Sequence, residues 1–149
     1  MQNAIIDMAK KRVISIKDYR DILNTLELDN ICLINSSFKL DKDKLSNNVK
    51  LVIKESAKSE LKDTFLIIRY KSTLKGINED TQEVGVNVET IHELQYSSTG
   101  EKEITQEFIE KFSSYSASML VWPYFREFVQ SQISKTLLPP LILPLKRQR

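Results

Sequence analysis

Hydrophobic positions recur at two different spacings along this chain of 149 residues. Residues 16–25 carry apolar side chains at helical spacing, and Ser15 followed by Asp18 is typical of a helix start. Residues 26–40 then alternate, which predicts a strand with a single apolar face. The predicted apolar face of this strand comprises Leu26, Leu28, Cys32, Ile34, Phe38 and Leu40.

Three further strands are predicted downstream. A short one is expected at residues 49–53, where the alternation stops at the polar run 55–60. Residues 61–74 are rich in β-branched and aromatic side chains, which favours a central strand, and residues 84–96 show the cleanest alternation in the chain. Because only a short turn at residues 76–81 separates these last two strands, they are expected to pair as an antiparallel hairpin.

Helical spacing returns after Gly100, and a chain with its strands first and its helices last indicates the α+β class. The length suits a single domain, residues 1–149. We expect four parts: an N-terminal helical extension (1–25), an antiparallel sheet (26–97), helices (101–136), and a proline-rich apolar segment with a basic tail (137–149).

Composition narrows the function classes. The formal charge of +2 is too small to indicate a nucleic-acid partner. Cys32 is the only cysteine and His92 the only histidine, so one chain has neither an intrachain disulfide nor a thiolate–imidazole metal cage. The longest apolar run, residues 137–145, is too short for a membrane span and contains three prolines. We therefore expect a cytoplasmic protein that neither enters a membrane nor binds a metal.

Catalytic motifs are missing from the sequence. The glycines are too scattered for a phosphate-binding loop, and no pair of carboxylates stands out. Cys32 and His92 fall on predicted apolar strand faces, where a core residue is commoner than a nucleophile or base. We expect no enzymatic activity and no cofactor.

Two apolar features instead suggest binding. Seven of the twelve aromatic residues lie in residues 108–128, more than one helical stripe needs to pack on a sheet. For Trp122 and Tyr124 a core role and a binding role are about equally supported. The second feature is residues 137–145 (LLPPLILPL), which proline keeps extended, so that the domain, a second subunit or a client must cover the apolar side chains.

These features resemble the SecB family of export chaperones. Residues 121–127 (VWPYFRE) are similar to the aromatic-Pro-Tyr-x-Arg-Glu signature that opens the main helix of that family, and residues 134–144 (SKTLLPPLILP) are similar to the apolar segment that follows it. The resemblance implies a four-stranded antiparallel sheet with the main C-terminal helix on one face. It also implies a dimer of dimers that holds unfolded precursor proteins for the translocase.

We therefore expect an ATP-independent holdase for unfolded clients, and the resemblance implies that it assembles as a homotetramer. The alternative is a dedicated adaptor or antitoxin-stabilising chaperone with one partner, since the N-terminal helix and near-neutral charge resemble solitary SecB-like proteins that accompany toxin–antitoxin pairs. The expected partners are unfolded polypeptide clients, and in addition the resemblance implies the SecA motor or an antitoxin. Arg126 is expected to anchor the helix through a carboxylate. The expected client groove comprises Phe112, Trp122, Tyr124, Leu138, Leu141 and Leu143.

Overall fold

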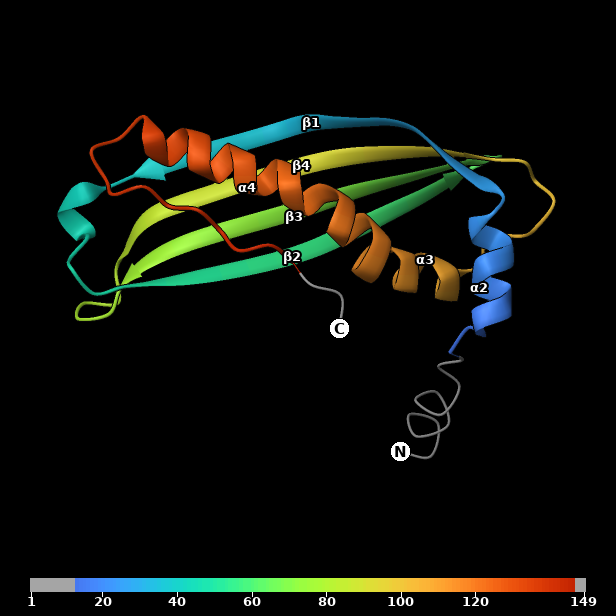
Figure 1. Cartoon of the computed structure of the whole chain (residues 1–149), viewed down its shortest axis with the longest axis horizontal. Coiled ribbons are helices and arrows are strands. Elements are labelled where there is room, and N and C mark those ends of the chain that lie inside the picture. Colours follow the sequence, from blue (N-terminus) through green and yellow to red (C-terminus); the bar gives the residue numbers. More distant parts are fainter. Residues whose placement is uncertain (1–12, 147–149) are drawn as a thin grey trace.

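Four long antiparallel strands form one sheet, and the helices α3 and α4 run across one of its faces (Figure 1). The structure is a computed structural model that describes residues 13–146. The strand order is β1-β4-β3-β2, so β1 and β2 are the two edges. The elements are α2 (Ile16–Leu23), β1 (Leu26–Leu40), η1 (Lys42–Lys44), β2 (Val49–Lys62), β3 (Phe65–Asn78), β4 (Val84–Ser98), α3 (Gln106–Phe112), the π-helical turn η2 (Ser113–Ala117) and α4 (Ser118–Ser134).

The short N-terminal helix forms where its apolar spacing predicted it. Ser15 caps α2 by accepting a hydrogen bond from the backbone N–H of Asp18 at 3.1 Å. The helix then packs on α3 through Tyr19, whose ring lies 4.9 Å from that of Phe108. Residues 1–12 of the expected extension and residues 147–149 of the expected basic tail lie outside the described part of the chain.

The prediction of a short second strand was wrong. Strand β2 continues through the polar run and pairs with β3 without a register break, from Val49 opposite Asn78 to Lys62 opposite Phe65. Polar residues do not end the strand because β2 lies at the sheet edge, where both its faces are largely open to solvent. The turn therefore falls after Lys62, and the central strand is Phe65–Asn78 rather than 61–74.

The predicted apolar face of β1 was wrong in its middle part. Two register shifts interrupt the pairing of β1 with β4, after Leu28 and after Leu33. An extra residue at such a bulge reverses which side chains share a face. As a result Ile31 pairs with the buried Leu94 and Leu33 with the buried His92. Ile31 and Leu33, rather than Cys32 and Ile34, therefore lie on the helix-covered face of the sheet.

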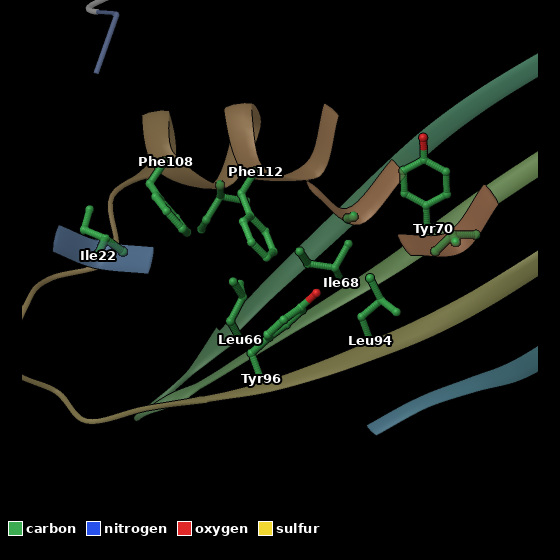
Figure 2. Close-up of a cluster of buried hydrophobic side chains, with 11 residues drawn as sticks. Ile22, Leu66, Ile68, Tyr70, Leu94, Tyr96, Phe108 and Phe112 are labelled. Atoms are coloured by element: carbon green, nitrogen blue, oxygen red, sulfur yellow. The ribbon is translucent and has the colours of Figure 1, made fainter. Parts of the chain in front are cut away.

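The buried side chains form two separate hydrophobic clusters under the helices. The α3 core lies beneath α2 and α3 (Figure 2), and the α4 core lies beneath α4. The α3 core includes Ile22, Leu66, Ile68, Tyr70, Leu94, Tyr96, Phe108 and Phe112. The α4 core comprises Leu74, Val86, Val88, Trp122, Phe125, Val129, Ile133 and Leu143.

A polar row crosses the sheet between the two cores. Ser72 of β3 pairs with Thr90 of β4, and Glu55 and Ser36 continue the same row on the two edge strands. Ser72 and Thr90 are fully buried, and within residues 13–146 neither hydroxyl oxygen has a hydrogen-bond partner. The two cores are therefore separated by hydroxyl groups whose burial adds little to the free energy of unfolding.

Candidate functional site

The proline-rich segment, residues 137–146, returns from the end of α4 and runs beside this helix over β3 and β2 (Figure 1). Two side chains of α4 hold its backbone: Trp122 Nε1 donates to the carbonyl of Pro144 at 2.9 Å, and Arg126 Nε donates to the carbonyl of Leu143 at 2.8 Å. Since Trp122 and Arg126 are one helical turn apart, they present donors to successive carbonyls. We call the surface beside α4 that receives this segment the α4 groove.

Alternate side chains of the segment point in opposite directions. Leu143 is 3% exposed in the α4 core and Leu141 packs partly against it, whereas Ile142 is 65% exposed. This is the expected behaviour of an extended chain, in which neighbouring side chains lie on opposite sides. Over residues 141–143 the segment therefore turns Leu141 and Leu143 toward the α4 core and Ile142 to solvent, whereas Leu145 is exposed.

The far end of the segment is fixed by polar contacts. Lys146 Nζ forms an ion pair with Glu55 of β2, donates to the hydroxyl of Ser118, and lies 5.2 Å from the ring centre of Trp122. These contacts tie the segment to both walls of the α4 groove, the helix and the edge strand.

An open cavity of about 410 Å³ begins at Glu55, where the segment reaches Lys146. It is lined by residues of β2, α3 and η2, Glu110 of α3 among them, and by Tyr70 of β3. Burial is the main factor that raises the pKa of Tyr70 to about 12, so the phenol stays neutral. The cavity adds a partly polar space at the Glu55 end of the α4 groove.

The structure brings together four of the six residues predicted for the groove. Trp122 and Leu143 belong to the α4 core, and Leu138 and Leu141 pack against it. Phe112 lies instead in the α3 core, 3% exposed and stacked on Phe108.

Tyr124, the sixth predicted residue, lies apart from this set. It is 48% exposed, and its ring is 5.9 Å from that of His92 on β4. Tyr124 and the buried Phe112 are therefore separate from Trp122 and from the three predicted leucines, which belong to the proline-rich segment itself.

Three polar contributors were missed by the sequence. Glu55 was assigned to the polar run expected to end the second strand, and Lys146 to the basic tail of the chain. Arg126 was expected to meet a carboxylate; that prediction was wrong, since its acceptor is the carbonyl of Leu143. The four-residue spacing from Trp122 was the only local signal that Arg126 would share its face of α4.

His92 makes the stability of this region sensitive to pH. The side chain is 4% exposed and its Nδ1 atom has no hydrogen-bond partner within the described residues, and burial lowers its pKa below the ordinary 6.5. Below about pH 6.5 the unfolded chain binds a proton that the folded chain resists, so stability present above this pH is lost as the pH falls toward the lowered pKa. The free energy of unfolding changes by at most about 1.4 kcal/mol per pH unit when one group takes up one proton.

Urea unfolding between about pH 7.5 and pH 6 should show this loss for the wild type and a flatter profile for His92→Leu. This range lies above the ordinary pKa of carboxylates, which limits their contribution. Parallel profiles for the two proteins would contradict the assignment to His92.

Residues 13–146 contain no group of three or more His, Cys, Asp or Glu side chains placed to hold a metal ion. None of the helices in this part of the chain has the length and apolar character that a membrane crossing requires.

Comparison with known proteins finds similarity in structure and none in sequence. No protein-family model and no curated protein matches the chain in sequence. Among solved structures, the Mycobacterium tuberculosis Rv1957 SecB-like chaperone, in complex with a ChAD peptide from the HigA1 antitoxin, matches with a TM-score of 0.74 and 14% identity, over 89% of this chain and 99% of that chain. A protein of unknown function from Streptococcus agalactiae overlaps with a TM-score of 0.35 and 7% identity, over 80% of this chain and 96% of that chain. The predicted α+β architecture is confirmed, and the chain has the fold of a SecB-like chaperone.

Proposed function

We propose that this protein is an ATP-independent chaperone that binds extended apolar segments of unfolded polypeptides in the α4 groove. The observation that carries the proposal is the proline-rich segment, which already occupies the groove as an extended apolar chain. Trp122 and Arg126 bind it through backbone carbonyls, which every polypeptide offers. Apolar contacts add about 25 cal/mol per Å² buried, so many different clients can bind with modest affinity.

In this proposal the proline-rich segment and the client compete for one surface. A client strand replaces the contacts of Leu143 and the carbonyl of Pro144, and a longer client extends into the cavity beyond Glu55. The cost of displacing the segment lowers the apparent affinity for clients. The proposed clients are unfolded or precursor proteins, as the resemblance to SecB implies.

A second candidate is a dedicated chaperone for one antitoxin. It is favoured by the match to a SecB-like chaperone that carries an antitoxin peptide. The two candidates share the fold and differ in breadth: a general holdase protects several unrelated clients, and a dedicated chaperone protects one.

We also propose that copies of the chain assemble into a homotetramer. Strand β1 is a sheet edge with partly exposed aliphatic side chains at Leu28, Leu33 and Ile34, and Tyr124 adds an exposed aromatic ring. Apolar side chains on an unpaired edge favour association. Sedimentation at micromolar concentration should give about four subunits, and a clean monomer would contradict the assembly.

The function is tested with two readouts on the full chain. The first is suppression of aggregation for several unrelated unfolded proteins and for an antitoxin peptide. The second is the fluorescence of Trp122, the only tryptophan, during titration with a client that lacks tryptophan. We expect several clients to be protected and the emission to shift as Pro144 leaves the indole. Protection of the antitoxin peptide alone would favour the second candidate, and no protection with unchanged emission would contradict both.

A further inference from the structure

The open face of the sheet, opposite the helices, has an uneven distribution of charge. Residues of β3 alternate between the buried face and this open face, and the register of β2 assigns its side chains to the same two faces. Lys50, Lys54 and Lys58 of β2 lie on the open face, opposite Ile77, Thr73 and Arg69. Lys75 of β3 lies opposite Val52 and is therefore a diagonal neighbour of both Lys50 and Lys54. We call Lys50, Lys54, Lys58 and Lys75 the lysine stripe.

The lysine stripe is not neutralised, although other cations on this face are. Arg69 meets Glu93 at 3.0 Å and Glu60 at 3.5 Å, and Lys71 meets Glu89 at 3.5 Å. Within residues 13–146, no member of the lysine stripe forms an ion pair. Successive members on β2 are four residues apart, which places them about 13 Å apart along the strand. An anionic partner would therefore find several free cations along one line.

The same strand offers two further kinds of contact. Because β2 is an edge of the sheet that residues 13–146 form, no strand of this part of the chain pairs with its outer N–H and C=O groups. On the helix side, Val49, Leu51 and Ile53 alternate with the lysines and are 37%, 41% and 37% exposed. A strand added at this edge would thus meet cations on one of its faces and aliphatic side chains on the other.

We propose that the edge of β2 docks an extended polypeptide in which acidic and apolar residues alternate, as a fifth strand of the sheet. Its backbone pairs with β2, its carboxylates meet the lysine stripe, and its apolar side chains cover Val49, Leu51 and Ile53. A peptide suits this face better than a single-stranded nucleic acid, which binds through stacked aromatic rings. Among the described strands, Phe65 is the only aromatic residue on the open face, and it lies at the far end of β3 from Lys75.

The test measures binding of a fluorescent peptide of about ten residues, a strand's length, with Glu and Val in alternation. A peptide of the same composition with Glu and Val in two blocks is the sequence control. The stripe variant changes Lys50, Lys54, Lys58 and Lys75 to Gln. The matched variant changes Lys17, Lys42, Lys102 and Lys135 to Gln, which removes the same charge elsewhere.

We expect the wild type and the matched variant to bind the alternating peptide within about twofold of each other, and the stripe variant to bind about tenfold more weakly at low salt. Hydrogen exchange should slow at β2 amides when the peptide is bound.

Three results would overturn the proposal. Equal losses in both variants would mean unspecific attraction to net charge. Tighter binding of a single-stranded oligonucleotide than of the peptide would mean that the partner is a nucleic acid and that the proposed class of partner is wrong. No peptide binding by the wild type, together with self-association of the stripe variant, would mean that the lysines only guard the edge against pairing. The test contains no unfolded client, so its failure leaves the proposed chaperone function unaffected.

Discussion

Replacing Phe125 with alanine is expected to lower the free energy of unfolding by about 3–5 kcal/mol. The Phe125 ring is fully buried in the α4 core with Leu74 and Val88 of the sheet, and it lies 5.8 Å from the Trp122 ring. The substitution removes apolar contact area and leaves a cavity under α4 that the long strands cannot collapse to fill. This loss would be a large part of the total stability of a domain of this size.

The neighbouring Tyr124→Ala variant is the matched control. This variant also removes an aromatic ring, but the ring of Tyr124 is 48% exposed, so the free energy of unfolding should fall by less than about 1 kcal/mol. Urea unfolding of both variants with an unchanged denaturant slope is the measurement. Similar losses for the two variants would show that α4 does not present Phe125 to the sheet as described.

Replacing Leu143 with alanine is expected to release the proline-rich segment and to increase client affinity by about tenfold or more. Truncation of a buried leucine commonly costs about 2–5 kcal/mol. Here Leu143 is the one fully buried anchor of its segment, alongside the carbonyl contacts from Trp122 and Arg126. The segment can detach while the sheet and helices stay folded, so the loss of global stability is limited to its own docking free energy. A vacant groove then binds clients without this competition.

Trp122 emission, client titration and limited proteolysis of residues 137–146 measure the release. Ile142→Ala is the control, because this neighbouring side chain is 65% exposed and should leave the segment docked. A released segment with unchanged client affinity would mean that clients bind elsewhere, and the competition proposed for the α4 groove would be abandoned.

The sequence predicted the strands whose burial is one-sided. Strand β4 alternates without interruption because one face is covered by helices along its length, and its pairing with β3 follows from the short connection. The predicted second strand ended too early, because an edge strand such as β2 tolerates lysine and glutamate on both faces and so shows no apolar alternation there. The shifts in β1 were missed because one extra residue at a bulge changes the face of later side chains without changing composition.

The candidate site was predicted only in its apolar part. Leu141 and Leu143 could be singled out because proline keeps their segment extended, but the pairing of Lys146 with Glu55 depends on how the chain returns over the sheet. Phe112 and Tyr124 were assigned to the groove because both lie in the aromatic-rich residues 108–128. A concentration of aromatic residues does not say which face of a helix each one takes, and the π-helical turn η2, which has more residues per turn than an α-helix, lies between the two.

The polar row between the two cores has a consequence for how the molecule opens. Ser72 and Thr90 contribute little cohesion at the middle of the sheet, where a continuous core would otherwise join the α3 and α4 halves. The two halves can therefore loosen with different free energies, as separate cooperative units. The first turn of α4 belongs to the α3 half, because Val121 lies in the α3 core. Fluctuations that free the rest of α4 and the proline-rich segment need not disturb α2 and α3, so the α3 half can stay folded while the α4 half opens.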